Sequence, residues 1–398
     1  MPDPHPHSVA AHYGGDFDDD AVSAWAGELR ARLEAPEVTL GLVFMAPRLF
    51  EQAAEILEII RVHARVPLLA GCSSQGLIAE DREIEEDAGI SLALYHLPGA
   101  RLESVHFGQA QVEACETELD WHEATGVSAE EVNSWLVFVD PFHLDGERWL
   151  DQWNAAWPGI AVMGGLASAG KRKGTQVYLN GDVLEEGGVA VAVCGDVRLR
   201  GVVSQGCTPI GDTWTITGTQ DHFIHEIANR PAYEVLVETF DGLNPEEQEK
   251  TKGNIFVGLV VNEYLEDYHR GDFLIRNLLG ADPNVGALAV GALPRVGQTM
   301  QFQRRDARAA SEDFDALLEH SQAEEVPVYG GVLCCCNGRG RHLFGAPGHD
   351  AGLVQQRLGP LGLAGFFCNG EIGPVGERNF LHGYTASLAL FVGDTPGA

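Results

Sequence analysis

The chain has 398 residues, 45% of them hydrophobic, which is enough for two or three domains with real cores. Acidic residues number 58 against 26 basic ones, giving a formal net charge of -32. Nucleic acids and anionic membranes are bound through clustered Lys and Arg, and the densest basic run here is only 171–173. The charge therefore argues against both as partners.

Targeting and membrane-spanning signals are missing from the sequence. No apolar stretch reaches the roughly 18 residues of a membrane helix, and 1–20 lacks the basic and apolar regions of a signal peptide. We expect 1–20 to be a disordered tail. None of the eight cysteines forms a CxxC pair, so we expect reduced thiols in a cytoplasmic protein.

The first predicted element is a helix over 18–34, with Asp18 to Asp20 as caps. A pattern then occurs three times, over 38–97, 134–197 and 326–392. Each copy has an apolar strand, a helix, a strand that ends in small residues, and an apolar closing strand. A helix-length connection between two strands predicts a parallel pair in each copy.

Between the second and third copies, 198–325 predicts antiparallel strands, a helix near 232–240 and another over 310–320. We expect the acidic segment 244–250 to be a loop or domain boundary. The predicted fold class is mixed α/β, with two layered domains built from related units and mixed sheets. We place a tail and first helix at 1–37, and the two domains at 38–240 and 241–393.

Small, polar and reactive residues gather at the ends of the apolar strands, where layered α/β proteins bind ligands. Each group also has a plain structural explanation, such as a tight turn or close packing. Arg276 is a further candidate, because a charged residue inside an otherwise apolar strand is costly unless it is paired. The candidate ligand-binding residues are Cys72, Ser73, Ser74, Gly165, Arg276, Asn277, Asn337, Arg339, Asn369, Glu371 and His382.

Several of these motifs resemble the FIST family, named for F-box and intracellular signal transduction proteins. The N-terminal part of the resemblance rests on AGCSSQGLI, GGLASAG and GCTPIG, and the C-terminal part on FLIRNLLG, CCCNGRG and FFCNGEIGPVG. It covers nearly the whole chain. The resemblance implies a sensory protein that binds small ligands. This sequence has no F-box, kinase, cyclase or receiver segment, so we expect a separate signalling partner.

The leading hypothesis is a binding protein with an amino-acid-like ligand and no cofactor, in which Arg339 or Arg276 binds a carboxylate and Glu371 an ammonium. The alternative is a thiol-dependent enzyme, with Cys368 or Cys336 as nucleophile, His382 as base and Glu371 or Asn379 as orienting residue. A third alternative is a metal site formed by Cys335, Cys368, His382 and Glu371, but the sequence lacks the close ligand pairs that zinc sites show. A protein-binding scaffold, whose acidic surface favours a basic partner, is the last alternative.

Overall fold

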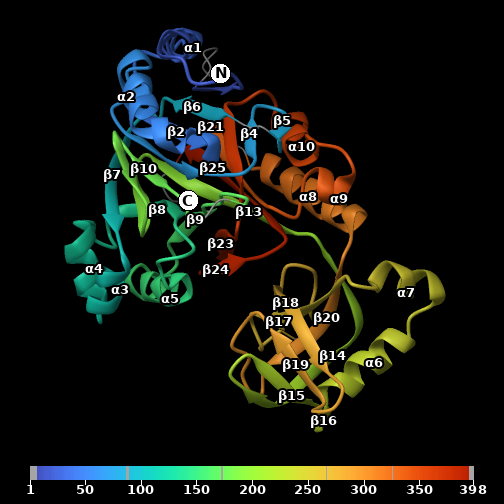
Figure 1. Ribbon diagram of the computed structural model, residues 1–398. Coiled ribbons are helices and arrows are strands. Elements are labelled where there is room, and N and C mark those ends of the chain that lie inside the picture. Colours follow the sequence, from blue (N-terminus) through green and yellow to red (C-terminus); the bar gives the residue numbers. More distant parts are fainter. Residues whose placement is uncertain (1–6, 87–88, 172–173, 266, 325, 394–398) are drawn as a thin grey trace. The chain divides into compact units, whose positions relative to one another are not determined.

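The computed structural model describes residues 7–86, 89–171, 174–265, 267–324 and 326–393. They form two compact units (Figure 1). Unit 1 combines the chain up to Val203 with Phe314–Leu381 and the residues from Thr385 onward, and unit 2 contains Ser204–Asp313 and His382–Tyr384. The predicted mixed α/β class is confirmed. The compact units do not follow one cut of the chain, and the domains at 38–240 and 241–393 remain a prediction.

Unit 1 is built from three copies of one arrangement. Copy 1 contains β1 (Ser8–Tyr13), α1 (Asp19–Arg32), β2 (Leu40–Met45), the 3-10 helix η1 (Pro47–Gln52), α2 (Ala53–His63), β3 (Leu69–Ser73), β4 (Leu77–Ala79), β5 (Arg82–Ile84) and β6 (Ile90–Tyr95). Copy 2 contains β7 (Ala100–Phe107), α3 (Gln109–Ala114), α4 (Glu118–Thr125), β8 (Val132–Val139), α5 (Gly146–Ala156), β9 (Ala161–Leu166), β10 (Val177–Leu179), β11 (Asp182–Leu184) and β12 (Gly188–Gly195).

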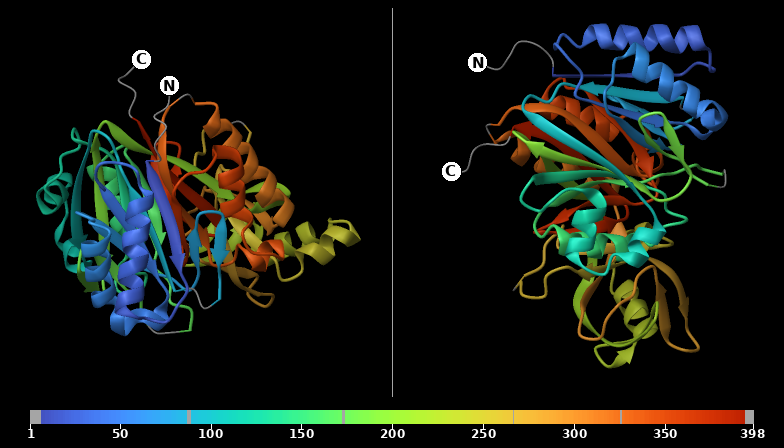
Figure 2. Two further views of the ribbon diagram at one scale, coloured as in Figure 1. Left: turned by 90° about the horizontal axis from the view of Figure 1, so that it is seen from above. Right: turned by 90° about the vertical axis from the view of Figure 1, so that its left-hand side faces the viewer.

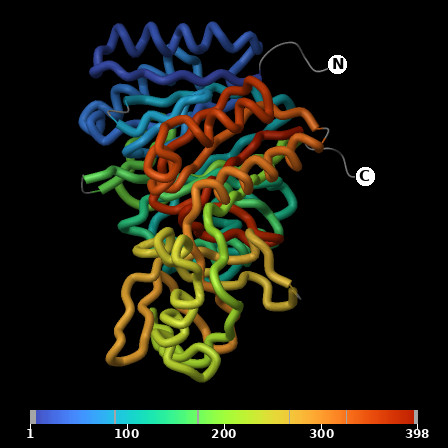
Figure 3. Tube along the Cα trace, turned by 90° about the vertical axis from the view of Figure 1, so that its right-hand side faces the viewer, coloured from blue at the N-terminus to red at the C-terminus, as the bar shows by residue number. Residues whose placement is uncertain are grey.

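Copy 3 has the same order of elements but is interrupted by unit 2, so that the chain leaves after β13 and returns at α8 (Figure 3). Its elements are β13 (Val197–Gln205), α8 (Ala307–Gln322), β21 (Val328–Cys336), α9 (Arg341–Phe344), α10 (His349–Leu358), β22 (Leu363–Cys368), β23 (Glu371–Val375), β24 (Arg378–His382) and β25 (Thr385–Gly393).

Each copy forms a six-stranded sheet that is completed by a hairpin from another copy. The sheet orders are β1-β6-β2-β3-β10-β11, β7-β12-β8-β9-β23-β24 and β13-β25-β21-β22-β4-β5. The β2–β3, β8–β9 and β21–β22 pairs are parallel, as predicted, and the closing strands β6, β12 and β25 pair antiparallel beside them. The hairpins pass in one cyclic direction, so unit 1 has pseudo-threefold symmetry.

The three sheets turn their inner faces toward one shared core and their outer faces toward helices. Seen from above, helices lie on three sides of the strands of unit 1 (Figure 2). Alternate residues of a strand face opposite sides of its sheet, which is why wholly apolar runs such as LGLVFM and WLVFV are buried on both faces. Rings from all three copies meet in the inner core, where Phe44 packs on Phe138 and Phe366.

One glycine recurs at the same place in each parallel pair. A Cβ atom on Gly71, Gly164 or Gly365 would lie 1.7, 1.9 or 1.9 Å from a carbonyl oxygen of the neighbouring strand. No other residue leaves room for this approach. Packing of the two parallel strands therefore requires the small residue that occurs in all three copies. These glycines are not evidence that a ligand binds at the strand ends.

Unit 2 is a closed antiparallel barrel. Its strands pair in the order β14-β20-β17-β18-β19-β15, and β14 is long enough to pair with β15 as well, which closes the ring. Its elements are β14 (Cys207–Gln220), β15 (Phe223–Ile227), β16 (Arg230–Pro231), α6 (Ala232–Asp241), α7 (Pro245–Thr251), β17 (Ile255–Val260), β18 (Phe273–Asp282), β19 (Ala287–Val290) and β20 (Thr299–Arg305).

Two local expectations are wrong. Residues 8–13 of the expected tail form β1, because Val9 and Ala10 are apolar and pair with β6. The acidic segment 244–250 forms most of α7, since Asn244 caps it through Glu247 N and Lys250 pairs with Glu246. The helices over 18–34, 232–240 and 310–320 are confirmed within a few residues. Within the described residues, no helix combines the length and apolarity that a bilayer crossing requires.

Candidate functional site

The structure places eight of the predicted ligand-binding residues in unit 1, near the carboxyl ends of β3, β9, β21 and β22. These are Cys72, Ser73, Ser74, Gly165, Asn337, Arg339, Asn369 and Glu371. Because strand ends of all three copies meet here, residues distant in sequence become neighbours. We call the polar group at this place the strand-end site, and it consists of Ser73, Ser74, Gln75, Ser168, Asn337 and Asn369.

A chain of carboxamide groups crosses the strand-end site. Gln75 Nε2 donates to Asn337 Oδ1 at 2.8 Å, and Asn337 Nδ2 donates to Asn369 Oδ1 at 2.8 Å. Asn369 Nδ2 then donates to the carbonyl of Ala167 at 3.0 Å. Gln75 and Asn369 are exposed, and Asn337 is half-buried. Side chains from copies 1 and 3 are thus joined to the backbone of copy 2 in one solvent-facing edge.

The serines lie beneath this edge and join the copies to one another. Ser74 Oγ and Ser168 Oγ both lie within hydrogen-bond distance of the carbonyl of Phe367, at 2.7 and 2.6 Å. Ser73 Oγ donates to the carbonyl of Ser168 at 3.1 Å. All three serines are buried, so their hydroxyls are used within the protein. We therefore assign them a structural role, and the exposed amides are the groups that remain for a ligand.

Arg339 is fully buried and its charge is balanced inside the protein. Its Nε and Nη2 atoms donate to the two carboxylate oxygens of Asp350 at 2.6 and 2.9 Å. His349 Nδ1 lies 2.9 Å from Asp350 Oδ1, and the Arg339 guanidinium lies over the ring of Phe344. Burial opposes ionisation of Asp350, but the paired guanidinium outweighs it and holds the pKa of Asp350 well below its usual range. Arg339 thus binds a carboxylate of the protein itself, Asp350, where the sequence predicted the carboxylate of a ligand.

Two glutamates of the β4–β5 hairpin lie beside this ion pair, and neither was among the predicted site residues. Glu83 accepts hydrogen bonds from the backbone N–H groups of Gly348, Asp350 and Ala351 and so caps α10. Burial, and then the nearby Asp350 charge, raise the pKa of Glu83. Glu85 Oε1 accepts from Arg341 N at 2.8 Å, and its Cα lies near Gly76, the residue that follows Gln75 of the strand-end site.

Glu371 stands where the other copies have apolar side chains. In each copy, the residue after the recurrent glycine pairs with the first residue of the hairpin that another copy contributes to the sheet. These pairs are Cys72 with Val177, Phe366 with Leu77, and Gly165 with Glu371. Val177 and Leu77 are buried core residues. A packing role alone would be met by another aliphatic residue, so the carboxyl group at 371 needs a reason of its own.

The surroundings of Glu371 favour its neutral form. It is fully buried, Cys368 Sγ lies 3.1 Å from Oε1, and Thr385 N donates to Oε2 at 3.1 Å. Burial raises the pKa of Glu371 to about 8, and the two hydrogen bonds and the Arg339 charge oppose this only in part. Glu371 is thus a buried acid that titrates near neutral pH.

Cys368 does not have the environment of a nucleophile, whereas Cys336, the other predicted nucleophile, is half-buried at the end of β21. Burial, and then the carboxyl of Glu371, raise the pKa of the Cys368 thiol well above its ordinary value. A reactive thiol needs the opposite, namely a lowered pKa and partial exposure. Cys335, a candidate in the metal alternative, is also buried with a raised pKa. No group of three or more metal-ligating side chains was found in the part of the chain that the structure describes.

The other three predicted residues belong to unit 2. Arg276 is half-buried on β18 and its Nη1 donates to the carbonyl of Ile275 at 3.2 Å. Asn277 is exposed and accepts a hydrogen bond from Tyr384. His382 is buried at the end of β24. Its pairing with Cys368 as a catalytic base therefore remains a prediction.

Comparison with known proteins identifies the family. Family models described as FIST N domain and FIST C domain match residues 39–230 and 232–374. The chain is 37% identical over 374 residues to the uncharacterized protein Rv0628c of Mycobacterium tuberculosis, covering 94% of this chain and 96% of that one. It is also 37% identical over 379 residues to the uncharacterized protein Mb0898c of Mycobacterium bovis, covering 94% and 95%.

Among solved structures, the chain is similar to a cyanuric acid hydrolase from A. caulinodans, with a TM-score of 0.37 and 10% identity over 98% of this chain and 100% of that one. A likeness of this size does not identify a shared site. FIST domains are associated with sensing in signal transduction. Matches that together span most of the residues from 39 to 374 show that the chain belongs to the FIST family.

Proposed function

We propose that this chain is a small-ligand-binding sensory protein whose ligand binds at the strand-end site of unit 1. The observation that carries the proposal is the carboxamide chain of Gln75, Asn337 and Asn369. Each of these amides has two N–H donors, and the hydrogen bonds described use one of each. The remaining donors, and Gln75 Oε1, are available to a ligand that both donates and accepts.

An amino-acid-like ligand fits these groups. Its carboxylate would accept hydrogen bonds from the free amide N–H groups, and the exposed Lys171 follows β9 by a few residues in the same region. Its ammonium would be attracted by Glu85, whose carboxylate lies beside Gly340 and whose Cα lies near Gly76. Glu371 and Arg339 lie deeper and act on the site indirectly in this proposal. The signal would pass to a separate protein in the cytoplasm.

A thermal-shift screen of the purified chain against single amino acids tests the proposal. A ligand at about a hundred times its dissociation constant adds about 2.7 kcal/mol of stability, which gives a readable change in melting temperature. Gln75→Ala removes an exposed amide and should abolish the shift. Gln356→Ala is the matched control, because Gln356 is also exposed but lies on α10 outside the site. A shift that survives Gln75→Ala would place the ligand elsewhere.

A further inference from the structure

Two thiols of copy 3 lie side by side at the ends of neighbouring strands. Cys336 is the last residue of β21 and Cys368 is the last residue of β22, and the two are direct partners in this parallel pair. Alternate residues of a strand face the same side of its sheet, so Cys336 shares the inner face with Cys334. Cys334 and Cys368 both belong to the inner core. The thiols of Cys336 and Cys368 therefore point to the same side from adjacent backbone positions.

The spacing of these two residues is that of a disulfide. Neighbouring strands lie roughly 4.8 Å apart, and the Cα atoms of disulfides lie about 4.4–6.8 Å apart. The thiols also interact electrostatically, because burial, then Glu371, and then Cys334 and Cys336 raise the pKa of the Cys368 thiol. Cys334 precedes Cys336 by two residues on the same strand, a Cα separation of roughly 6.6 Å. Cys368 is thus the better placed partner for Cys336.

This pair of thiols is specific to copy 3. The equivalent positions lie three residues beyond the recurrent glycine and three residues beyond the strand partner of that glycine. They hold Ala46 and Ser74 in copy 1, and Asp140 and Ala167 in copy 2. Alanine therefore occupies the position of Cys336 in one copy and the position of Cys368 in another. The fold does not require sulfur at either place.

The two thiols differ in access and in surroundings. Cys336 is half-buried, whereas Cys368 is buried and its thiol donates to Glu371 Oε1 at 3.1 Å. Arg339 N donates to the carbonyl of Cys336 at 2.8 Å, and the Arg339 guanidinium interacts electrostatically with Cys336. A nearby cation favours the thiolate, which is the form that peroxides oxidise. Cys336 is therefore the thiol that a peroxide reaches first, and Cys368 has a proton acceptor in contact with it.

We propose that Cys336 and Cys368 form a redox pair that small hydroperoxides convert to a disulfide. The Cys336 thiolate attacks one oxygen of hydrogen peroxide and the O–O bond breaks, which leaves a sulfenic acid on Cys336 and a hydroxide that takes up a proton from solvent. The Cys368 sulfur then attacks the Cys336 sulfur and the S–OH bond breaks. The proton of Cys368, which Glu371 can accept, combines with the leaving hydroxide. Two thiols and one peroxide thus give one disulfide and two waters.

The disulfide would act on the strand-end site. It would join the residues that immediately precede Asn337 and Asn369, whose side chains share a hydrogen bond of 2.8 Å. A covalent bond at this place would fix the spacing of the two amides. The proposal itself does not rest on ligand binding at the strand-end site.

Oxidation of the native protein with hydrogen peroxide, followed by peptide mass spectrometry, tests the proposal. The remaining thiols are alkylated in denaturant, and the protein is digested with trypsin without reduction. Cleavage after Arg339 and Arg357 places Cys336 and Cys368 in different peptides. We expect these two peptides to appear joined, with a mass lower by two hydrogens than their sum. Dithiothreitol should separate them.

Three variants assign the bond to its two sulfur atoms. Cys336→Ala and Cys368→Ala should each abolish the joined peptides, and in Cys368→Ala dimedone should trap the sulfenic acid of Cys336. Because alanine occupies the equivalent position in another copy, both variants should fold, which melting curves verify. Cys334→Ala is the matched control, since Cys334 lies on the same face two residues away, and it should leave the joined peptides unchanged.

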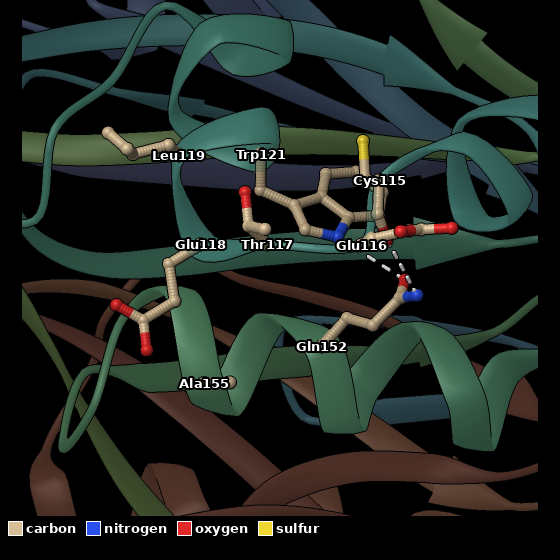
Figure 4. A pocket seen from close by; sticks show the side chains of 8 residues that line it. All are labelled: Cys115, Glu116, Thr117, Glu118, Leu119, Trp121, Gln152 and Ala155. Carbon is tan, nitrogen blue, oxygen red and sulfur yellow. Dashed lines mark hydrogen bonds between the residues drawn. The ribbon is translucent and has the colours of Figure 1, made fainter.

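Cys115 provides a comparison within the same protein. It lines a pocket between α4 and α5, and no other cysteine lines that pocket (Figure 4). The peptide that contains Cys115 should therefore not appear in a joined product. Oxidation of Cys336 to a sulfinic acid without joined peptides would overturn the proposal. So would joined peptides that persist in Cys368→Ala, that are lost in Cys334→Ala, or that form only in denaturant.

Discussion

Replacing Glu371 by Gln should change how the stability of unit 1 depends on pH. The pKa of Glu371 is about 8 in the folded protein against 4.5 for an ordinary glutamate. Between these values the folded state keeps a proton that the unfolded state has released. The free energy of unfolding therefore falls as pH rises, by about 1.4 kcal/mol per pH unit and about 5 kcal/mol in all. Below pH 4.5 this contribution is fully present, and above pH 8 it is lost.

Glu371→Gln keeps the size of the side chain and removes the titration. Urea unfolding of both proteins from pH 5 to pH 9, followed by tryptophan fluorescence, isolates the effect because groups that do not interact with Glu371 cancel in the difference. Six of the seven tryptophans lie in unit 1, so the signal reports on the right unit. We expect the stability of the wild type relative to the variant to fall steadily with pH. A difference that stays constant would show that Glu371 does not titrate in this range and would refute the reasoning.

Three further results are expected from the same physics. Asp350→Ala leaves Arg339 buried without a counter-ion and should cost about 3–5 kcal/mol of unfolding free energy in chemical denaturation, whereas a cost below about 1 kcal/mol would mean that water reaches the guanidinium. Replacing Gly71, Gly164 or Gly365 by Ala should prevent stable folding in every case, whereas the control Gly27→Ala, with nothing within 4 Å of the added Cβ, should be neutral or stabilising. Circular dichroism and melting curves measure the folding of all four variants. A stable fold in any of the first three would contradict the packing argument. In native protein at pH 8, Cys336, the most exposed of the eight thiols, should react with a thiol reagent much faster than the buried Cys368, and all eight should react in denaturant. Fast reaction of Cys368 would restore the hypothesis of an enzyme with Cys368 as nucleophile.

The repeated architecture could be predicted because each copy carries long apolar strands around a helix, and these patterns are local. The exchange of hairpins could not, since β4 and β10 have three residues each and their partners belong to other copies. β1 was missed because a short run of Ser, Val and Ala beside Pro and His has no strong pattern of its own. Its burial comes from pairing with β6.

The region of the candidate site could be predicted because small and polar residues end several strands, but the roles within it could not. Gln75 meets Asn337 across 262 residues, and nothing local marks that pair. Arg339 was expected to bind a ligand, but it pairs with Asp350, a residue in the first turn of α10 that was not among the predicted site residues. Glu371 could be predicted as a candidate because it follows an apolar strand close to a thiol and a histidine in the sequence. Only the strand pairing shows that the equivalent positions in the other copies are apolar.

Side-chain amide NMR tests ligand binding at the strand-end site most directly. The NH₂ signals of Gln75 and Asn369 can be assigned by their loss in Gln75→Ala and Asn369→Ala, and followed while single amino acids are added to ¹⁵N-labelled protein. We predict that at least one amino acid shifts both pairs of signals saturably, with the NH₂ signals of Gln356 unchanged. If no amino acid moves the Gln75 and Asn369 signals, or if the Gln356 signals move equally, the strand-end site is not the binding site.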